Sequence, residues 1–395
     1  MRFDQIDRSI VSLIEPIPSG ASELETLNLR DRSSIYLGKL ITEILRFSRR
    51  NHLANWDPWI VKDCDRYRMF YLQGVAGQSP WWITSNIRGG ISTDLQHWQD
   101  LGILLTPNPD QPLESGRISA GCALKENDTL YLFYSSGGNE GKALKSEAIG
   151  LATSTDGLQW KRHYDHFPLV PTDDDPWYGR CHWTNHFHWR DPYVFKDPKS
   201  GLYYMFICAS SKTEGNFQGC VGLAVSDRID GAYNIQPPVI ATNPETAKDW
   251  GFYHLERPQV IFKNNQYHLF FSCFRMFLNP AWIKKQPKRI TTSALHWYVS
   301  DCVTGPYIPS NYNNAIVPGS ETTGLYATSL LDIPGSDEFI AYGWYHRLHT
   351  LEASPRFRMR WVSDRWQLSR DRPLPQELLP NLTLSGIAPK SHESS

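Results

Sequence analysis

The chain has 395 residues, with 40 basic and 41 acidic side chains and a formal net charge of −1. No long run of like charge appears, and this balance argues against a polyanionic partner such as nucleic acid. Aromatic residues make up 13% of the chain. That share is high for a core alone, and flat amphipathic rings also stack on the faces of sugars.

Seven cysteines are scattered along the chain without a CxxC spacing, so neither a disulfide framework nor a zinc site is predicted. We expect buried free thiols instead. The segment from Met1 to Gln5 has no basic stretch leading into an apolar one, and no apolar run approaches membrane-spanning length. These features predict a soluble, cytoplasmic protein without a membrane partner, and they leave its oligomeric state open.

Residues 1–50 differ in pattern from the rest of the chain. Between Ser33 and Arg50 apolar residues recur at helical spacing, and Ser33 can cap the start of a helix. The recurring residues are Ile35, Leu37, Leu40, Ile41, Ile44, Leu45 and Phe47. We therefore expect an N-terminal helical extension over residues 1–50 that packs on the outside of a domain formed by residues 51–395.

From residue 51 the chain repeats. Aromatic strand-like segments recur at intervals of about 64 to 72 residues. They are Tyr67–Tyr71, Tyr131–Tyr134, Tyr203–Phe206, Tyr267–Phe271 and Phe339–Tyr342. A second segment ending in Ser-Asp, Ser-Thr-Asp or a close variant, and soon followed by another aromatic residue, comes after each. These are Gly90–Asp94, Gly150–Asp156, Gly222–Asp227, His296–Asp301 and Arg358–Asp364. Four short strands in each of five repeats predict an all-β, five-bladed β-propeller.

Three acidic residues lie in the opening strands of three repeats. The motifs are Trp56-Asp57-Pro58, Arg190-Asp191-Pro192 and Glu256-Arg257-Pro258. Because proline favours the start of a strand, we expect the three acids at equivalent positions, at the mouths of three blades. Closure of a propeller would then bring them together at the central channel.

Such a cluster suits chemistry at a sugar bond, which needs one carboxylate to attack or to activate water and one carboxyl to protonate the leaving oxygen. Asp57 and Glu256 fit these roles by type, and Asp191 would stabilise positive charge on the sugar ring. Arg190 and Arg257 could hold an acid in place or bind sugar hydroxyls. A single acid of this kind is more often a turn residue or a surface ion pair, but three at matching positions favour an active site.

The three motifs, in this order and spacing, resemble those of the levansucrase and invertase group, glycoside hydrolase families 68 and 32, which are related to family 43. The resemblance extends from about Asn55 to the last blade. It implies that Asp57 is the nucleophile, Asp191 the transition-state stabiliser and Glu256 the general acid/base. It further implies a retaining reaction on β-fructofuranosides such as sucrose, by hydrolysis or fructosyl transfer. We expect no cofactor and no metal.

The resemblance also implies substrate-binding residues around the three acids. They are Trp56, Ser119, Arg190, Arg257, His254 and Arg275. Ser119 lies where the family has a Trp-Ser-Gly-Ser segment, with Ile118 in place of the tryptophan. His254 stands where levansucrases often carry a second acid, and Arg275 is within one residue of an arginine that binds the glucosyl part of sucrose.

Three other interpretations are open. His182, His186 and His188 could suggest a metal site, although we favour a loop that lines the sugar site, with Trp183 or Trp189 as a stacking surface. The enzyme could instead be an inverting, family 43-like arabinofuranosidase or xylosidase, whose carboxyls would lie about 6.5–9.5 Å apart rather than about 5–5.5 Å. A carbohydrate-binding propeller without catalysis is the third alternative, and the presence of all three acids argues against it.

Overall fold

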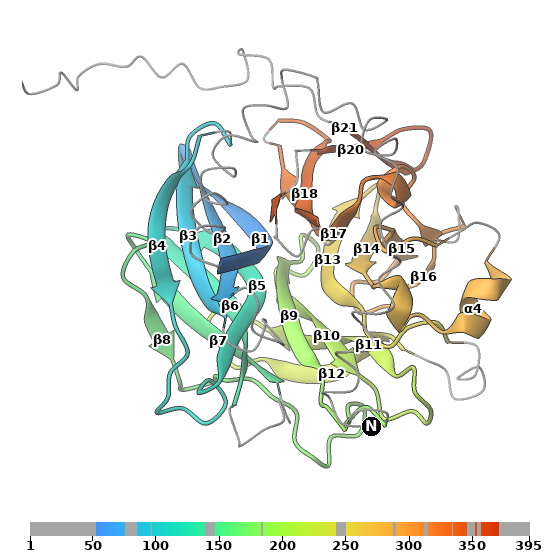
Figure 1. The fold of residues 1–395 in the computed structure, drawn as a ribbon, viewed down its shortest axis with the longest axis horizontal. Helices are drawn as coiled ribbons and strands as arrows, with labels where there is room; N and C mark the ends of the chain where they lie inside the picture. Colours follow the sequence, from blue (N-terminus) through green and yellow to red (C-terminus); the bar gives the residue numbers. More distant parts are fainter. Residues whose placement is uncertain are drawn as a thin grey trace, which may run out of the picture.

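A computed structural model of the chain describes residues 53–75, 85–95, 97–138, 147–182, 185–241, 250–286, 290–311, 315–333, 335–345, 352–353 and 357–370. These residues form five antiparallel sheets around a common centre, which confirms the predicted all-β, five-bladed propeller (Figure 1). The helical extension predicted for residues 1–50 lies outside the described residues. Among the described residues, no helix is long and apolar enough to cross a membrane.

Each blade is a sheet built from one stretch of the chain, with its first strand innermost. Blade 1 comprises β1 (Leu53–Asp63), β2 (Arg66–Val75), β3 (Asn86–Ser92) and β4 (Gln99–Leu105). Blade 2 comprises β5 (Arg117–Glu126), β6 (Thr129–Gly137), β7 (Glu147–Ser154) and β8 (Lys161–His163). Blade 3 comprises β9 (Trp189–Lys196), β10 (Tyr203–Ser210), β11 (Gly219–Ser226) and β12 (Asn234–Ile240).

The last two blades carry the short helices. Blade 4 comprises β13 (Glu256–Lys263), β14 (Gln266–Ser272), β15 (Leu295–Ser300) and β16 (Ile308–Pro309), with η4 (Arg275–Phe277) and α4 (Pro280–Lys285) between β14 and β15. Blade 5 follows η6 (Ser320–Thr322) and comprises β17 (Leu325–Asp332), β18 (Phe339–Tyr345), β20 (Phe357–Trp361) and β21 (Trp366–Arg370). The two-residue strand β19 (Glu352–Ala353) also pairs with β18.

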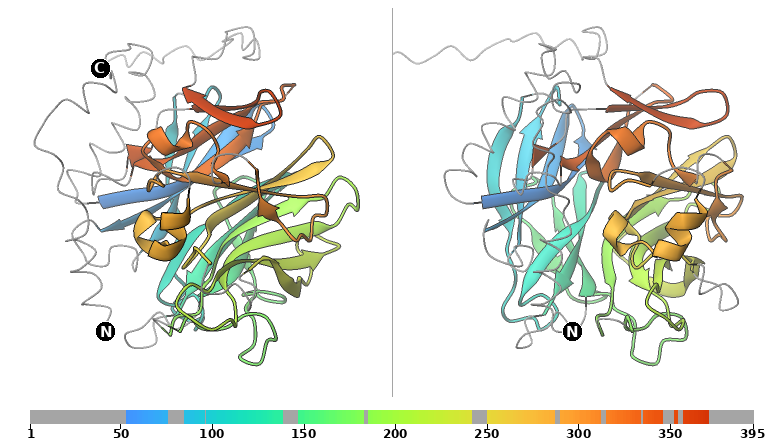
Figure 2. Two further views of the ribbon diagram at one scale, coloured as in Figure 1. Left: turned by 90° about the vertical axis from the view of Figure 1, so that its right-hand side faces the viewer. Right: turned by 45° about the vertical axis from the view of Figure 1, so that its right-hand side comes forward.

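The inner strands form a closed ring. Each of β1, β5, β9, β13 and β17 contacts the inner strands of the two neighbouring blades, and β17 contacts β1. Where blade 5 meets blade 1, the backbone N–H of Ile60 donates a hydrogen bond of 2.7 Å to the hydroxyl of Tyr342. Figure 2 shows this arrangement from two further directions. Strands that are far apart in the sequence therefore meet at the centre.

The sequence repeat corresponds to the second and third strands of the blades. The five aromatic segments lie in β2, β6, β10, β14 and β18, and their phenylalanine rings fill the spaces between sheets. The Ser-Asp segments end the third strands and make the turn to the fourth. In blade 1 the Ser92 hydroxyl accepts the N–H of Leu95 at 2.9 Å, and Asp94 accepts the N–H of His97 at 2.7 Å. This turn chemistry explains why the pair recurs.

The predicted equivalence of the three acids is wrong in one blade. Four inner strands carry a bulge in which two residues face one residue of the second strand. The bulged pairs are Asp57-Pro58, Asp191-Pro192, Arg257-Pro258 and Ala327-Thr328. Asp57 and Asp191 are thus equivalent, whereas Glu256 lies one residue earlier. The prolines mark the bulges and not the strand starts, because a bulged residue has no ladder partner for an N–H.

The bulges share a strained backbone. The φ angles are 46° at Asp57, 56° at Asp191, 53° at Arg257 and 50° at Ala327, all in the left-handed region. That region costs a residue with a side chain about 1–2 kcal/mol. Neighbouring contacts must therefore hold the kink in place, and such strain is common at functional sites.

Candidate active site

Side chains at the position before the bulge link neighbouring blades at the centre. In β9, β13 and β17 this position is held by Arg190, Glu256 and Tyr326. Nη2 of Arg190 lies 2.9 Å from Oε1 of Glu256, and the hydroxyl of Tyr326 donates to Oε2 of Glu256. Trp56 holds the same position in β1. Glu256 therefore accepts hydrogen bonds from both neighbouring blades.

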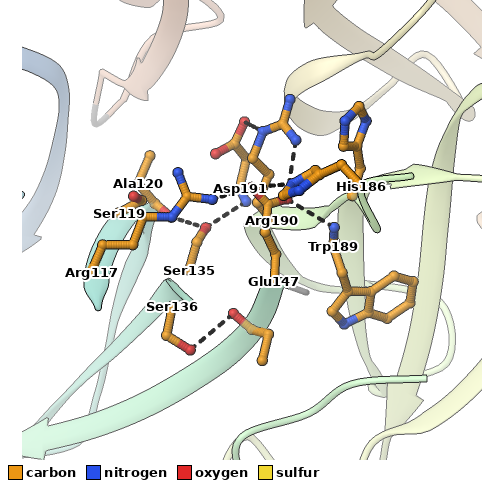
Figure 3. Close-up of polar contacts among 12 residues, drawn as sticks. Arg117, Ser119, Ala120, Ser135, Ser136, Glu147, His186, Trp189, Arg190 and Asp191 are labelled. Carbon is orange, nitrogen blue, oxygen red and sulfur yellow. Dashed lines mark hydrogen bonds and ion pairs between the residues drawn. The ribbon is translucent and has the colours of Figure 1, made fainter. Parts of the chain in front are cut away.

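Asp191 is held by contacts from blades 2 and 4. Its backbone N–H donates to the hydroxyl of Ser135 at 2.7 Å, and Ser135 in turn donates to the carbonyl of Ala120 at 2.6 Å (Figure 3). The carboxylate oxygen Oδ2 accepts the backbone N–H of Arg257 at 3.2 Å. Asp191 is buried. These bonds fix both the strained backbone and the carboxylate of Asp191.

Asp57 has a different environment. The indole Nε1–H of Trp344, in β18, donates to its Oδ1 at 2.6 Å. Burial raises the pKa of Asp57, and the charges of Asp191 and Glu256 raise it further, while Arg257 and the Trp344 hydrogen bond act in the opposite direction. The resulting pKa is about 7. The three predicted catalytic acids are thus close enough to influence one another's ionisation.

The other two acids respond to the same charges. Burial raises the pKa of Asp191 to about 6, with Arg190 opposing the shift and Glu256 adding to it. Burial also acts to raise the pKa of Glu256, but His254, Arg190 and the Tyr326 hydroxyl together hold it below its ordinary value. Groups coupled in this way share protons, and their apparent pKa values belong to the cluster.

Glu147, a residue that the sequence did not single out, anchors Arg190 from below. Its carboxylate lies 3.0 Å from Nη1 of Arg190, 2.5 Å from Nη2 of Arg117 and 3.3 Å from Nε2 of His186 (Figure 3). It also accepts the backbone N–H of Trp189 at 3.1 Å. Although burial opposes ionisation, the neighbouring Arg190, His186 and Arg117 side chains hold the pKa of Glu147 well below its ordinary value. A buried anion therefore fixes the guanidinium that reaches Glu256.

His254 completes the surroundings of Arg190 and Glu256. Its Nδ1 lies 3.1 Å from Nη2 of Arg190, which can only donate, so the proton of the neutral ring is on Nε2. That Nε2 lies 3.5 Å from Oε2 of Glu256. Burial lowers the pKa of His254 to about 4, so the ring is uncharged at neutral pH. His254 lies next to the predicted acid/base, as the sequence suggested.

The remaining predicted binding residues are spread more widely. Ser119 is half-buried, with its hydroxyl 3.5 Å from that of Ser85. The guanidinium of Arg257 donates to the Gly121 carbonyl at 2.7 Å and to the Ser329 hydroxyl at 2.9 Å, so this side chain ties three blades together. Trp56 is buried in the core shared by blades 1, 2 and 5.

Arg275 is exposed in η4, where its Nε donates to the Ile290 carbonyl at 3.1 Å. None of its contacts among the described residues reaches the three acids. Its predicted role in substrate binding therefore stays a prediction.

The segment before Asp191 corrects one interpretation. Trp189 is fully buried and packs edge-on against Tyr178, with ring centroids 4.9 Å apart, so it is a core residue and not a stacking surface for sugar. Trp183 lies outside the described residues. His186 pairs with Glu147 and His188 lies 3.7 Å from the Cys181 sulfur. Within the described ranges, no group of three or more histidine, cysteine or acidic side chains is placed to hold a metal ion.

Comparisons with known proteins find one family model and several solved structures that are similar to this chain. Residues 53–220 match the model of the glycosyl hydrolases family 32 N-terminal domain, a range that includes Asp57 and Asp191. The solved structure of inulosucrase from Halalkalicoccus jeotgali bound to kestose is similar, with a TM-score of 0.62 and 20% sequence identity over 82% of this chain and 89% of that chain. Bacillus subtilis levansucrase is similar with a TM-score of 0.59 and 16% identity over 83% and 89%. A levansucrase variant from B. megaterium gives 0.60 and 16% over 83% and 87%.

A search of curated proteins gives no match. Residues 53–220 are thus similar to a family 32 glycosyl hydrolase domain, and the five-bladed fold is similar to that of levansucrases and an inulosucrase. The chain is accordingly an enzyme, of the glycoside hydrolase or fructosyltransferase type.

Proposed function

We propose that this protein is a retaining enzyme that hydrolyses or transfers the fructosyl unit of β-fructofuranosides such as sucrose. The observation that carries the proposal is the convergence of Asp57, Asp191 and Glu256, from three blades, into one charge-coupled cluster. The similar solved structures include an inulosucrase with kestose and a levansucrase with sucrose, both fructosyl sugars. Their identity to this chain is low, so the sugar itself needs a direct test.

In the proposed reaction Asp57 is the nucleophile. Its Oδ2 forms a bond to the anomeric carbon while the bond from that carbon to the leaving oxygen breaks. Glu256 gives its proton to the leaving oxygen and then, as a carboxylate, takes a proton from the water or sugar that releases the fructosyl unit. Asp191, fixed by the N–H of Arg257, stabilises the positive charge that develops on the sugar ring.

The coupled acids set the pH dependence of this reaction. The reactive form holds one proton among the three carboxyls, on Glu256, with Asp57 and Asp191 ionised. The two highest pKa values of the cluster are about 7 and about 6. At a pH above the higher pKa, the cluster loses its last proton. At a pH below the lower pKa, the cluster binds a second proton. We therefore expect a bell-shaped pH profile of kcat/KM with its maximum between these values.

The decisive experiment is a panel of sugars with analysis of the product anomer. Sucrose, raffinose and a fructosylated oligosaccharide are incubated with the protein, alongside an arabinofuranoside and a xyloside, and released sugars and transfer products are measured. We expect turnover of the fructosides only, and NMR spectra recorded early in the reaction should show retention at the anomeric carbon. Turnover of the arabinofuranoside or xyloside with inversion would support the family 43-like alternative instead. Absence of turnover on every sugar would overturn the proposal.

A further inference from the structure

Blade 5 supplies a hydrogen-bond donor to each of the two acids that would flank the sugar bond. Tyr326 in β17 and Trp344 in β18 are direct partners in the β-ladder. Gly343 faces the bulge of β17, where a Cβ atom would lie 2.6 Å from the Tyr326 carbonyl oxygen. Glycine at this position lets the two strands close tightly beside the bulge. The Tyr326 hydroxyl then reaches Glu256 and the Trp344 indole reaches Asp57.

The indole of Trp344 is well fixed. Its side chain is buried, and its ring packs edge-on against Tyr326 at a centroid distance of 5.6 Å and against Phe274 at 6.2 Å. Phe274 itself stacks face to face on Tyr326, with centroids 3.6 Å apart. An N–H held this firmly can fix the orientation of the carboxylate that accepts it.

We propose that Trp344 is a positioning residue for the nucleophile, in which the indole N–H holds Oδ1 of Asp57 and leaves Oδ2 to attack. This inference rests on the proposed function. In the covalent step the Oδ2–carbon bond forms, the carbon–oxygen bond to the leaving group breaks, and the Glu256 proton moves to the leaving oxygen. The Trp344 N–H stays in place throughout and stabilises the carboxylate before the attack.

Trp344 also affects which acid carries the shared proton. Asp57 faces a set of ionisable groups from the neighbouring inner strands, namely Arg257, Asp191, Glu256 and Tyr326. The Trp344 hydrogen bond favours the ionised form of Asp57. Within the one-proton cluster it therefore favours the form in which the proton is on Glu256, as the reaction requires. Loss of this N–H should reduce the reactive form and make the last proton of the cluster harder to remove.

The test removes the N–H while keeping the shape of the ring. One variant carries benzothienylalanine in place of Trp344, because this isostere of tryptophan has sulfur where indole has N–H. A second variant is Trp344→Phe. Loss of a hydrogen bond to a charged group should lower kcat by about 10- to 100-fold, with KM changed by about threefold or less. The basic limb of the pH profile should move to higher pH.

Trp366→Phe is the matched control. Trp366 is buried in blade 5 like Trp344, but its Nε1 has no hydrogen-bond partner among the residues that the structure describes, so the same substitution removes no such bond there. We expect its kcat and its pH profile to match those of the unmodified protein. Unchanged kcat and an unmoved basic limb in a folded benzothienylalanine variant would show that Trp344 contributes packing only.

A measurement without substrate separates this proposal from the proposed function. A protonated carboxyl gives an infrared C=O stretching band, and the band that is missing in Asp57→Asn belongs to Asp57. The intensity of this band as a function of pH gives the pKa of Asp57. We expect its midpoint at about pH 7 in the unmodified protein and at higher pH in the benzothienylalanine variant. An equal midpoint in both overturns the role of Trp344. If Asp57→Asn keeps its turnover, by contrast, the assignment of the nucleophile fails.

Discussion

Two sides of the propeller centre hold their carboxylates in different ways. On the side of blades 3 and 4, Glu256 lies near three polar groups: the Arg190 guanidinium at 2.9 Å, the Tyr326 hydroxyl, and the uncharged His254 ring at 3.5 Å. On the side of blades 1 and 5, Asp57 accepts one indole N–H from Trp344. The pKa of Glu256 lies below its ordinary value, whereas burial and two neighbouring acids raise that of Asp57 to about 7.

In the protein without substrate, these pKa values favour the opposite protonation state from the one that reacts. The proton of the cluster favours Asp57, which must be ionised to attack, over Glu256, which must be protonated to act as an acid. A sugar that engages Arg190 would weaken its bond to Glu256 and raise the pKa of that acid. Positive charge developing on the sugar would lower the pKa of Asp57. Substrate binding is therefore expected to move the proton to Glu256.

The largest expected effect distinguishes the roles of Glu256 and Asp57 by comparing substrates whose leaving groups differ in their need for a proton. Glu256→Gln should lower kcat by about 10²–10⁴-fold on sucrose, because the leaving oxygen no longer receives a proton. On a fructoside with a nitrophenolate leaving group, which departs without protonation, most of that loss should vanish. Asp57→Asn should lose more than about 10⁴-fold on both substrates. Steady-state kinetics on the two substrates measures this, and equal losses for both variants on both substrates would contradict the division of roles.

The next effect concerns the buried anion beneath Arg190. Glu147→Gln leaves the buried Arg117 without its carboxylate partner and removes the anchor of Arg190. Breaking a buried ion pair from one side typically costs about 3–5 kcal/mol of folding free energy. Chemical denaturation should show this loss. The activity of the enzyme should fall as well, because Arg190 would no longer be held in place beside Glu256.

Glu126→Gln is the control for that substitution. Glu126 pairs with Lys196 at 2.8 Å, and the Glu126 and Lys196 side chains are 32% and 53% exposed to solvent. An exposed pair contributes about 1 kcal/mol or less, so this variant should keep nearly full stability. If Glu147→Gln were as stable as Glu126→Gln, the charged side of the site would not depend on its buried anion.

The sequence predicted the fold well because the repeat arises from local chemistry. Aromatic second strands fill the spaces between blades, and Ser-Asp pairs such as Ser92 and Asp94 build the turn between the third and fourth strands. Both signals are written in consecutive residues. The motifs around Asp57, Asp191 and Glu256 were visible for the same reason.

The surroundings of these acids could be predicted only in part. Tyr326 could have been found by aligning the inner strands on their bulges, since it holds the position of Arg190 and Glu256 in blade 5. Glu147 and Trp344 carried no comparable signal, because each reaches the centre from another strand or blade across distant sequence. The one-residue offset of Glu256 was missed because proline marks the bulge and not the strand start. Trp189 was misplaced because a lone aromatic residue does not reveal whether it faces a core or a ligand.

The smallest effect tests the strain on the side of Asp57. The folded protein holds the pKa of Asp57 at about 7, above the value of 3.8 expected for an unperturbed carboxyl. A folded-state pKa raised in this way favours folding at low pH, and this contribution is lost as the pH rises from about 4 to about 7. Asn cannot ionise, so Asp57→Asn should become more stable relative to the unmodified protein across the same range.

Each pKa unit corresponds to about 1.4 kcal/mol, but Asp57 is partly exposed and solvent screens some of the effect, so we expect a gain of about 1–3 kcal/mol at pH 8. Thermal denaturation of both proteins from about pH 4 to about pH 8 measures it. A difference in stability that does not change with pH would mean that Asp57 ionises as easily in the fold as in the unfolded chain. The contrast between the two sides of the site would then lie in hydrogen bonding alone. Arg257 and Trp344 would in that case fully offset the unfavourable free energy of an ionised nucleophile beside two other acids.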